Sequence, residues 1–325
     1  MNFNLRIWCV TFLSACLAAC GGGGGAAAED SVEMVTPPGQ GELAATVAVI
    51  GAAGQLVSPQ HMTYYGGNLY LVDVTSQVGS TGVGTVKKFN TSGVLQASIG
   101  TIENPVGVAF DTAGTMFVTG KKPSAGQGVL QVDTNGTVTE KKTGLNLSGL
   151  VIDGSSYTYV AAYSLGKVLS YNAGFVSGSD IAVSNQPVGL GYDSVGNGIF
   201  ITRFSGGSQG LYRFSTTASP VVATAYATSS YFNQPNAIAI RTSPSLEIYV
   251  VNTGGRSDQR SILKISSNGA VVETYLSATN VAHKLCNPTG IATDGSNLYI
   301  ANSTCSDGYS PNNTGFANSL VKVTF

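Results

Sequence analysis

Charge and histidine are both scarce in this sequence. Charged residues make up 10% of the 325 residues, the formal net charge is −1, and the two histidines are His61 and His283. Proteins that bind nucleic acid need a surface rich in Lys and Arg to neutralise phosphates. Because acidic and basic residues are nearly equal in number, we expect no nucleic-acid partner.

Helical periodicity and two familiar catalytic signatures are missing as well. Outside the first 19 residues, no stretch repeats apolar residues every 3.6 positions, so we expect few helices. There is no His-Glu-x-x-His zinc motif and no phosphate-binding loop. The sequence is instead rich in Gly and aromatic residues, with 42 Gly, 15 Tyr and 12 Phe. This composition is typical of many short β-strands joined by tight turns.

The first 20 residues, MNFNLRIWCVTFLSACLAAC, have the pattern of an export leader. Arg6 gives the positive start, and residues 7–18 form an apolar stretch that is too short to span a bilayer. Leu17-Ala18-Ala19-Cys20 then resembles the bacterial lipobox, which implies cleavage before Cys20 and acylation of its thiol and new amine. Several acyl chains make a stable anchor. The alternative is a plain secretory leader in which Cys20 is incidental.

The resemblance to lipoproteins implies a place for the mature chain. Residues 1–19 would be a signal peptide, and residues 20–42, which include Pro37-Pro38, a flexible tether. Gly21 rather than Asp follows Cys20, which by enterobacterial sorting rules favours the outer membrane. We therefore expect the cell envelope as the location, and the lipid bilayer as a partner through acylated Cys20.

The remainder, residues 43–325, contains an internal repeat. Asn/Gln-Pro is followed by a short apolar stretch and an Asp turn, as in Asn104-Pro105-Val106-Gly107-Val108-Ala109-Phe110-Asp111. Further copies begin at Gln186-Pro187 and Asn287-Pro288, and weaker ones at Pro59, Leu147 and Pro235. The spacing of roughly 40–54 residues is that of propeller blades. The pattern resembles the NHL repeat and, more loosely, the gluconolactonase-like propellers.

This resemblance implies an all-β fold, a six-bladed β-propeller of four-stranded antiparallel blades. In the second unit we predict strands at residues 107–110, 116–119, 128–132 and 137–140, with Asp111 capping the turn after the first strand. The sixth unit supplies only three strands. We therefore predict that the N-terminal strand at residues 44–51 closes the ring as the outer strand of the last blade. A seven-bladed ring is the alternative.

Loop length indicates which face of the ring binds. The connection from the second to the third strand lies on the face where the first strand begins, and five such connections are long, at residues 74–84, 120–127, 204–210, 253–260 and 303–319. We assign binding to this long-loop face and call the opposite face the tight-turn face. The candidate ligand-binding residues are His61, Asp73, Arg203, Asn236, Asn252 and Asn302. The alternative is that these groups only hydrogen-bond loop backbones.

Two functions remain open for such a ring. The preferred one is a binding or assembly module for a protein, peptide or glycan, with Arg203 as the anchor if the ligand is an anion. The alternative is a hydrolase or lyase that holds a divalent metal in the pore, as the gluconolactonase-like propellers do. Hard cations need clustered oxygen ligands, and Asp73 is the one carboxylate among the candidates. We therefore predict no cofactor and no catalytic residue, and leave the metal ligands unassigned.

The repeat alignment pairs two of the five cysteines. Cleavage would remove Cys9 and Cys16, and acylation would occupy Cys20. Cys286 precedes the first strand of the sixth unit and Cys305 follows its second strand, so both lie on the long-loop face. In the oxidising compartment that export implies, we predict a Cys286–Cys305 disulfide.

Overall fold

The computed structural model describes residues 46–78, 81–122, 126–143, 146–183, 186–205, 209–254, 260–278, 284–304 and 316–325. The predicted signal peptide, the tether and Cys20 lie outside these residues, as do His283 and Cys305. Strands dominate the described chain, and one short 3-10 turn, η1, covers Tyr163–Leu165. No helix in this part has the length and hydrophobicity that a membrane span requires.

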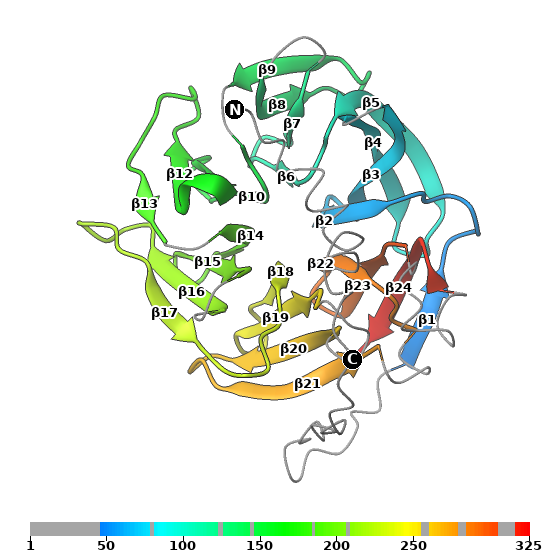
Figure 1. Cartoon of the computed structure of the whole chain (residues 1–325). Coiled ribbons are helices and arrows are strands. Elements are labelled where there is room, and N and C mark those ends of the chain that lie inside the picture. Colours follow the sequence, from blue (N-terminus) through cyan, green and yellow to red (C-terminus); the bar gives the residue numbers. More distant parts are fainter. Residues whose placement is uncertain are drawn as a thin grey trace, which may run out of the picture.

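The described strands form six four-stranded antiparallel blades around a central pore, and one pairing between Glu103 and Lys121 joins the first two blades into a single sheet (Figure 1). Each blade runs from an inner strand at the pore to an outer strand at the rim. The first three blades contain β2 (Pro59–Tyr65), β3 (Asn68–Val78), β4 (Thr81–Asn90) and β5 (Leu95–Glu103); β6 (Val108–Phe110), β7 (Met116–Lys121), β8 (Gln127–Val132) and β9 (Val138–Lys142); and β10 (Leu150–Ile152), β11 (Thr158–Ala162), β12 (Lys167–Tyr171) and β13 (Ile181–Ala182). The last three contain β14 (Pro187–Asp193), β15 (Gly198–Arg203), β16 (Gly210–Ser215) and β17 (Thr224–Ala227); β18 (Pro235–Arg241), β19 (Glu247–Asn252), β20 (Ser261–Ser266) and β21 (Val271–Ser277); and β22 (Pro288–Thr293), β23 (Asn297–Asn302) and β24 (Ser319–Thr324) with β1 (Thr46–Ile50).

The strand that precedes blade one closes the ring. β1 pairs antiparallel with β24, from Thr46 opposite Thr324 to Ile50 opposite Leu320. The outer strand of blade six, β1, therefore comes from the start of the described chain, whereas the other three strands of that blade come from its end. Such pairing ties the first and last parts of the ring together and protects both from fraying. The predicted closure by residues 44–51 is confirmed for residues 46–50.

The repeat located the strands of blade two to within two residues. Predicted at 107–110, 116–119, 128–132 and 137–140, they are observed at Val108–Phe110, Met116–Lys121, Gln127–Val132 and Val138–Lys142. Gly136, in the turn between the third and fourth strands, has a φ of 83°, which a residue without Cβ adopts without strain. Asp111 Oδ1 accepts the backbone N–H groups of Ala113 and Thr115, so the Asp-capped turn is confirmed.

One segment that was predicted as a long loop is a strand hairpin. Residues 74–84 fall mostly in β3 and β4, which stay paired up to Val78 opposite Thr81. Glycine is common in loops, but Gly84 lies within β4 at a position where no side chain would fit. A Cβ on Gly84 would lie 2.3 Å from the carbonyl oxygen of Asp73. A register shift between Val74 and Ser76 accompanies this close approach of the two backbones.

A cluster of buried apolar side chains fills each junction between blades. In β3, Leu71 packs in the cluster shared with blade six, and Val72 packs in the cluster shared with blade two. Neither side chain is exposed. This alternation follows from the two-residue period of a strand, and each such side chain contributes about 1.5–3 kcal/mol. Every blade therefore relies on both of its neighbours for its core.

Further contacts near the pore join neighbouring blades directly. Thr119 Oγ1 donates to the Ser148 carbonyl at 2.6 Å, and Thr289 Oγ1 donates to the Pro59 carbonyl at 2.8 Å. Gly189 approaches blade five so closely that a Cβ would lie 2.1 Å from the Asn236 carbonyl oxygen. These contacts fix the spacing of the inner strands and hence the shape of the pore.

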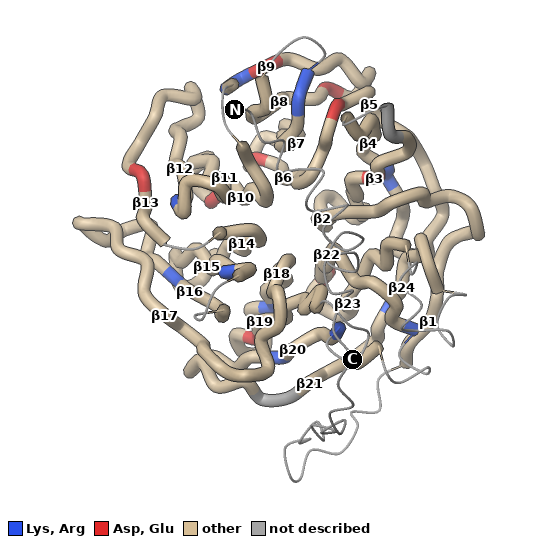
Figure 2. Tube along the Cα trace, viewed as in Figure 1, with Lys and Arg blue, Asp and Glu red and all other residues tan. Residues whose placement is uncertain are grey.

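Charged side chains of both signs are scattered around the ring (Figure 2). Several of them pair locally. Lys121 lies 3.1 Å from Glu103, and Arg241 and Lys264 lie 3.0 and 2.9 Å from Glu247. Local pairing of this kind leaves the two signs interspersed over the described surface.

Candidate functional site in the central pore

Asp73 lies within β3, the second strand of blade one, opposite Pro59, and caps the segment that leads into that blade. Its carboxylate accepts the N–H of Val57 at 3.0 Å and of Ser58 at 2.9 Å, and it lies 3.1 Å from Lys87 Nζ. The side chain is fully buried. Lys87 balances the charge and the N–H groups satisfy the oxygens, which makes a buried carboxylate tolerable. In this conformation Asp73 has a structural role and is closed to a ligand.

Asn252 and Asn302 occupy the same position in blades five and six. Asn252 Oδ1 accepts the N–H of Asn233 at 3.2 Å, and its Nδ2 donates to the Tyr231 carbonyl at 2.7 Å. Asn302 Oδ1 accepts the N–H of Cys286 at 3.1 Å. An amide suits this position because it both donates and accepts. Both side chains are buried, and in the structure both hydrogen-bond the backbone of neighbouring loops, which was the alternative to ligand binding.

Arg203 ends the second strand of blade four and differs from these residues. It continues the row of Ile199 and Ile201, which pack against blade three, so it lies at the long-loop end of that junction. Its guanidinium carbon lies 4.3 Å from the ring centroid of Tyr212. The residue is 6% exposed, its Nε has no hydrogen-bond partner, and no described carboxylate pairs with it. Arg203 therefore keeps donors that a ligand could use.

His61 lies in β2 and reaches across the pore. Its Nε2 is 3.2 Å from Asn236 Oδ1 in blade five. Its Cε1 lies beside Gly149 in blade three, where an added Cβ would come within 3.4 Å. The Asn236 amide continues the chain of contacts, because its Nδ2 donates to the Thr289 carbonyl of blade six at 3.2 Å. Of the six predicted site residues, His61 and Asn236 are the two that the structure brings into contact.

Hydrogen bonding assigns the proton of the His61 ring. Asn236 Nδ2 donates to Thr289, so its Oδ1 faces His61 as an acceptor and Nε2 carries the hydrogen. Nδ1 keeps its lone pair, and no described residue donates to it. Burial lowers the pKa of the imidazole from 6.5 to about 4, and the hydrogen bond to Asn236 opposes this by a smaller amount. The ring is therefore neutral at physiological pH, with Nδ1 as its proton acceptor.

A cavity of about 340 Å³ extends along the inner strands from His61. All six inner strands contribute to its wall, and more of the surface that faces the cavity is polar than apolar. Besides His61, its polar side chains are Thr63, Tyr64, Tyr192 and Thr293. The wall begins at His61 and continues to the far ends of β18 and β22, at Ile240 and Thr293. It thus occupies the half of the pore on the tight-turn face. His61 is the only one of the six predicted residues among the described residues that line it.

The location of this cavity differs from the predicted one. We expected binding on the long-loop face, but the cavity at His61 lies on the other side of the ring. All five long connections lie partly outside the described residues, so the long-loop prediction stays a prediction. Loop length could not reveal the pore cavity, because its wall consists of strands.

The residues around the cavity do not fit a divalent metal. Hard cations take several oxygen ligands, usually including carboxylates. The side chains of the described wall offer His61 Nδ1 and the hydroxyls of two threonines and two tyrosines, none of them a carboxylate, and Asn236 Oδ1 is already occupied by His61. Within the described residues, no group of three or more His, Cys, Asp or Glu side chains could hold a metal ion.

Cys286 lies just before β22, at the start of blade six. It is fully buried, and Asn302 accepts its N–H. Its predicted partner, Cys305, lies outside the described residues. The Cys286–Cys305 disulfide therefore stays a prediction.

Sequence reasoning did not single out Tyr192, at the end of the inner strand of blade four. Its side chain lines the pore cavity and also a cleft between blades three and four. An aromatic residue just before the turn Asp was the available signal, as in Phe110-Asp111 and Tyr192-Asp193. That signal is ambiguous, because Phe110 simply stacks on Tyr65 at 4.4 Å between centroids.

Comparison with known proteins places the fold. No family model matches the chain, and no curated protein is similar to it in sequence. Solved structures do match: a gluconolactonase from Xanthomonas campestris has a TM-score of 0.64 at 10% identity, over 86% of this chain and 89% of that one. The PQQ-bound aldose sugar dehydrogenase of Streptomyces coelicolor has a TM-score of 0.63 at 13% identity, over 86% and 98% of the two chains. A virginiamycin B lyase from Staphylococcus aureus has a TM-score of 0.55 at 11% identity, over 86% and 99%. The chain is thus a β-propeller with the fold that gluconolactonase-like and lyase-like propellers share.

Proposed function

We propose that the pore cavity is the active site of a hydrolase or lyase that opens a small ester or lactone. The observation that carries this proposal is the neutral His61 ring, whose Nε2–H is held by Asn236 and whose Nδ1 is left free beside a 340 Å³ cavity. Sites for small molecules are mostly apolar cavities with a few convergent polar groups and a titratable residue of shifted pKa.

In this mechanism His61 is the proton acceptor. In hydrolysis, Nδ1 takes a proton from water as the water oxygen bonds to the carbonyl carbon, and returns it to the alkoxide that leaves. In elimination, Nδ1 takes a proton from the carbon adjacent to the alkyl carbon that bears the ester oxygen. The C–H electron pair forms a C=C bond, the alkyl C–O bond breaks, and the acid portion leaves as a carboxylate. Asn236 is a positioning residue, since it holds the ring in the tautomer that this transfer needs. The wall of the cavity restricts bulk water around the substrate.

The structural neighbours favour this reading over the binding module. A gluconolactonase and a virginiamycin B lyase are both enzymes by name, and each covers 86% of this chain. The reading departs from the predicted alternative in one respect, because the described pore residues do not fit the metal that was expected with it.

Turnover of small lactones and esters tests the proposal. The mature chain would be assayed with glucono-1,5-lactone and with phenyl acetate, by acid release and by mass spectrometry. We expect turnover of at least one of these, with kcat reduced about 10²- to 10⁴-fold in His61→Gln. Val195→Ala serves as the control, because Val195 is exposed and does not line the pore cavity. Absence of turnover, or turnover equal in His61→Gln and the wild type, would contradict the proposal.

A binding module remains the second candidate, supported by Arg203. A buried guanidinium without a counter-ion costs several kcal/mol, which the contact with Tyr212 offsets only in part. An anionic group of a ligand would supply the missing partner. We expect galacturonate, at about 10 mM, to raise the Tm of the wild type but not of Arg203→Gln. An equal shift in both proteins, or none in either, would exclude Arg203 as the anchor.

We also propose that acylated Cys20 anchors the protein in the cell envelope, with the propeller as the exported domain. The support is the match of Leu17-Ala18-Ala19-Cys20 to the lipobox. Radiolabelled palmitate should label the wild type and not Cys20→Ser. Label that persists in Cys20→Ser would overturn the anchor.

A further inference from the structure

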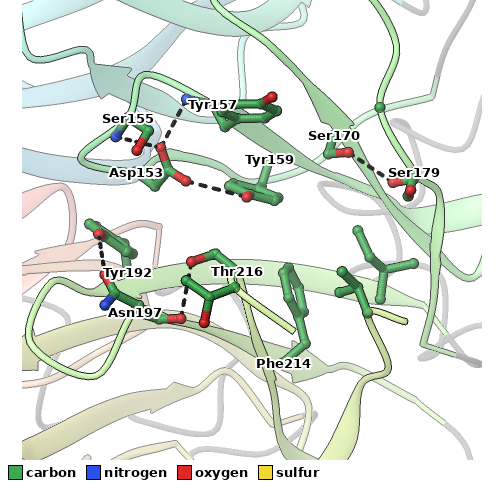
Figure 3. Close-up of a pocket in the computed structure, with 14 residues that line it drawn as sticks. Asp153, Ser155, Tyr157, Tyr159, Ser170, Ser179, Tyr192, Asn197, Phe214 and Thr216 are labelled. Atoms are coloured by element: carbon green, nitrogen blue, oxygen red, sulfur yellow. Dashed lines mark hydrogen bonds between the residues drawn. The ribbon is translucent and has the colours of Figure 1, made fainter. Parts of the chain in front are cut away.

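A second cavity lies between blades three and four, on the tight-turn face (Figure 3). Its volume is about 440 Å³, within the usual range for small-molecule sites. Figure 3 shows Asp153 and Tyr157 on one side of the space and Tyr192, Asn197 and Thr216 on the other. The two sides come from different blades, so the cleft has the same rigid support as the ring itself.

The cleft is open because no ring from either blade fills it. At the corresponding junction of blades five and six, Phe325 packs against Tyr249 and Tyr275, with centroids 5.6 and 6.3 Å apart. Tyr159 is the counterpart of Tyr249 in blade three, and it contacts Phe214 at 5.6 Å without a third ring above them. Apolar ring surface is therefore left at the base of the cleft.

The rim of the cleft keeps unused hydrogen-bonding groups. The side chain of Tyr157 is 41% exposed, and its hydroxyl has no partner among the described residues. Asn197 Oδ1 accepts the Tyr192 hydroxyl at 3.4 Å, but no described residue accepts from its Nδ2. Asp153 is the only charged side chain among the described residues of the lining, and its oxygens accept the N–H groups of Ser155 and Tyr157 and the Tyr159 hydroxyl.

We propose that this cleft binds a neutral saccharide. A sugar ring has apolar C–H faces, which pack on aromatic rings such as Tyr157, and hydroxyls that pair with donors and acceptors such as Asn197 Nδ2. The lack of a cation in the described lining favours a neutral sugar over an acidic one. Tyr192 lines both this cleft and the pore cavity, so a bound saccharide would lie next to the pore. The proposal does not depend on catalysis at His61.

Two substitutions probe opposite sides of the cleft. Tyr157→Ala removes the exposed ring. Asn197→Gly removes the amide at a residue whose φ is +47°, a conformation that Gly adopts easily, so the turn is kept. Val195→Ala is the matched control, because Val195 is in the same turn, is 75% exposed and does not line the cleft. His61→Gln separates this site from the pore.

The test is calorimetric titration of the mature protein with cellotetraose, xylotetraose, maltotetraose and tetra-N-acetylchitotetraose, each up to about 10 mM. We expect saturable binding of at least one, about tenfold weaker or lost in Tyr157→Ala and in Asn197→Gly, and unchanged in Val195→Ala and His61→Gln. Binding of none of the four, or binding that both cleft variants retain, would overturn the proposal. Loss of binding in His61→Gln alone would assign the saccharide to the pore, which also contradicts it.

Discussion

Replacing His61 with Gln should flatten the dependence of stability on pH between about pH 7 and pH 4. In the unfolded chain the imidazole titrates at its ordinary value of 6.5, whereas burial lowers the pKa to about 4 in the folded protein. Between these values the unfolded chain binds more protons than the folded one. The free energy of unfolding therefore falls as the pH drops from 6.5 and stops falling, for this residue, below about 4.

The shift sets the size of the effect. The pKa of His61 is about 2.5 lower in the folded protein than in the unfolded chain. At about 1.4 kcal/mol for each pH unit, this difference changes the free energy of unfolding by about 3 kcal/mol. Above pH 6.5 the ring is neutral in both states, so His61 contributes no pH dependence there. The His61 side chain is partly exposed to solvent in the pore, so this change in the free energy of unfolding is an upper bound.

Urea unfolding at a series of pH values would measure the effect in the wild type and in His61→Gln. Carboxyl groups such as Glu247 and Asp294, whose pKa values hydrogen bonds lower, contribute equally to both proteins and cancel in the difference. Glutamine keeps an N–H donor for Asn236. His283→Gln serves as the control for the other histidine. A difference between wild type and His61→Gln that stays constant from pH 7 to pH 4 would refute the buried neutral ring.

Four further predictions concern the ring and its cysteines. Deleting residues 46–50 should lower the Tm of the whole domain, because it exposes the edge of β24; an unchanged Tm in a thermal melt would show that β1 is dispensable. Gly149→Ala should cost about 1–3 kcal/mol in urea unfolding, since its Cβ would lie 2.5 Å from a carbonyl oxygen, and a neutral effect would contradict this close approach. Asp73→Asn should cost about 3 kcal/mol, because it breaks a buried ion pair, and a loss below about 1 kcal/mol would contradict that role. Unfolded, unreduced mature protein should show no reactive thiol if Cys286 and Cys305 are paired, and two thiols would exclude the bond.

The fold was predictable because its repeat consists of residues that determine the backbone. Asn104, Gln186 and Gln234 precede the prolines that open blades and have φ values of 44°, 44° and 50°. This left-handed conformation is uncommon outside Gly, and Asn is enriched in it. Three blades share this local geometry, so the pattern returns along the sequence and can be read from it.

The site was less predictable because its contacts join different blades. His61 and Asn236 are 175 positions apart, and their contact depends on the curvature of the ring and on the space beside Gly149. An Asn at the end of a second strand can hydrogen-bond either a ligand or a neighbouring loop. Asn252 bonds a loop because backbone groups lie within its reach, and the sequence does not show where those groups lie. The prediction of a loop at 74–84 was wrong for a similar reason. Gly84 lies in a strand, and the close approach of a neighbouring backbone leaves no room for a side chain there.

Nitrogen NMR of the histidine rings would test the central claim most directly. The chain has two histidines, so comparison with His61→Gln assigns the His61 signals without ambiguity. The account predicts a neutral ring with its hydrogen on Nε2, a free Nδ1, and no protonation until the pH falls to about 4. Protonation of His61 near pH 6.5, as in an exposed imidazole, or a hydrogen on Nδ1, would contradict it.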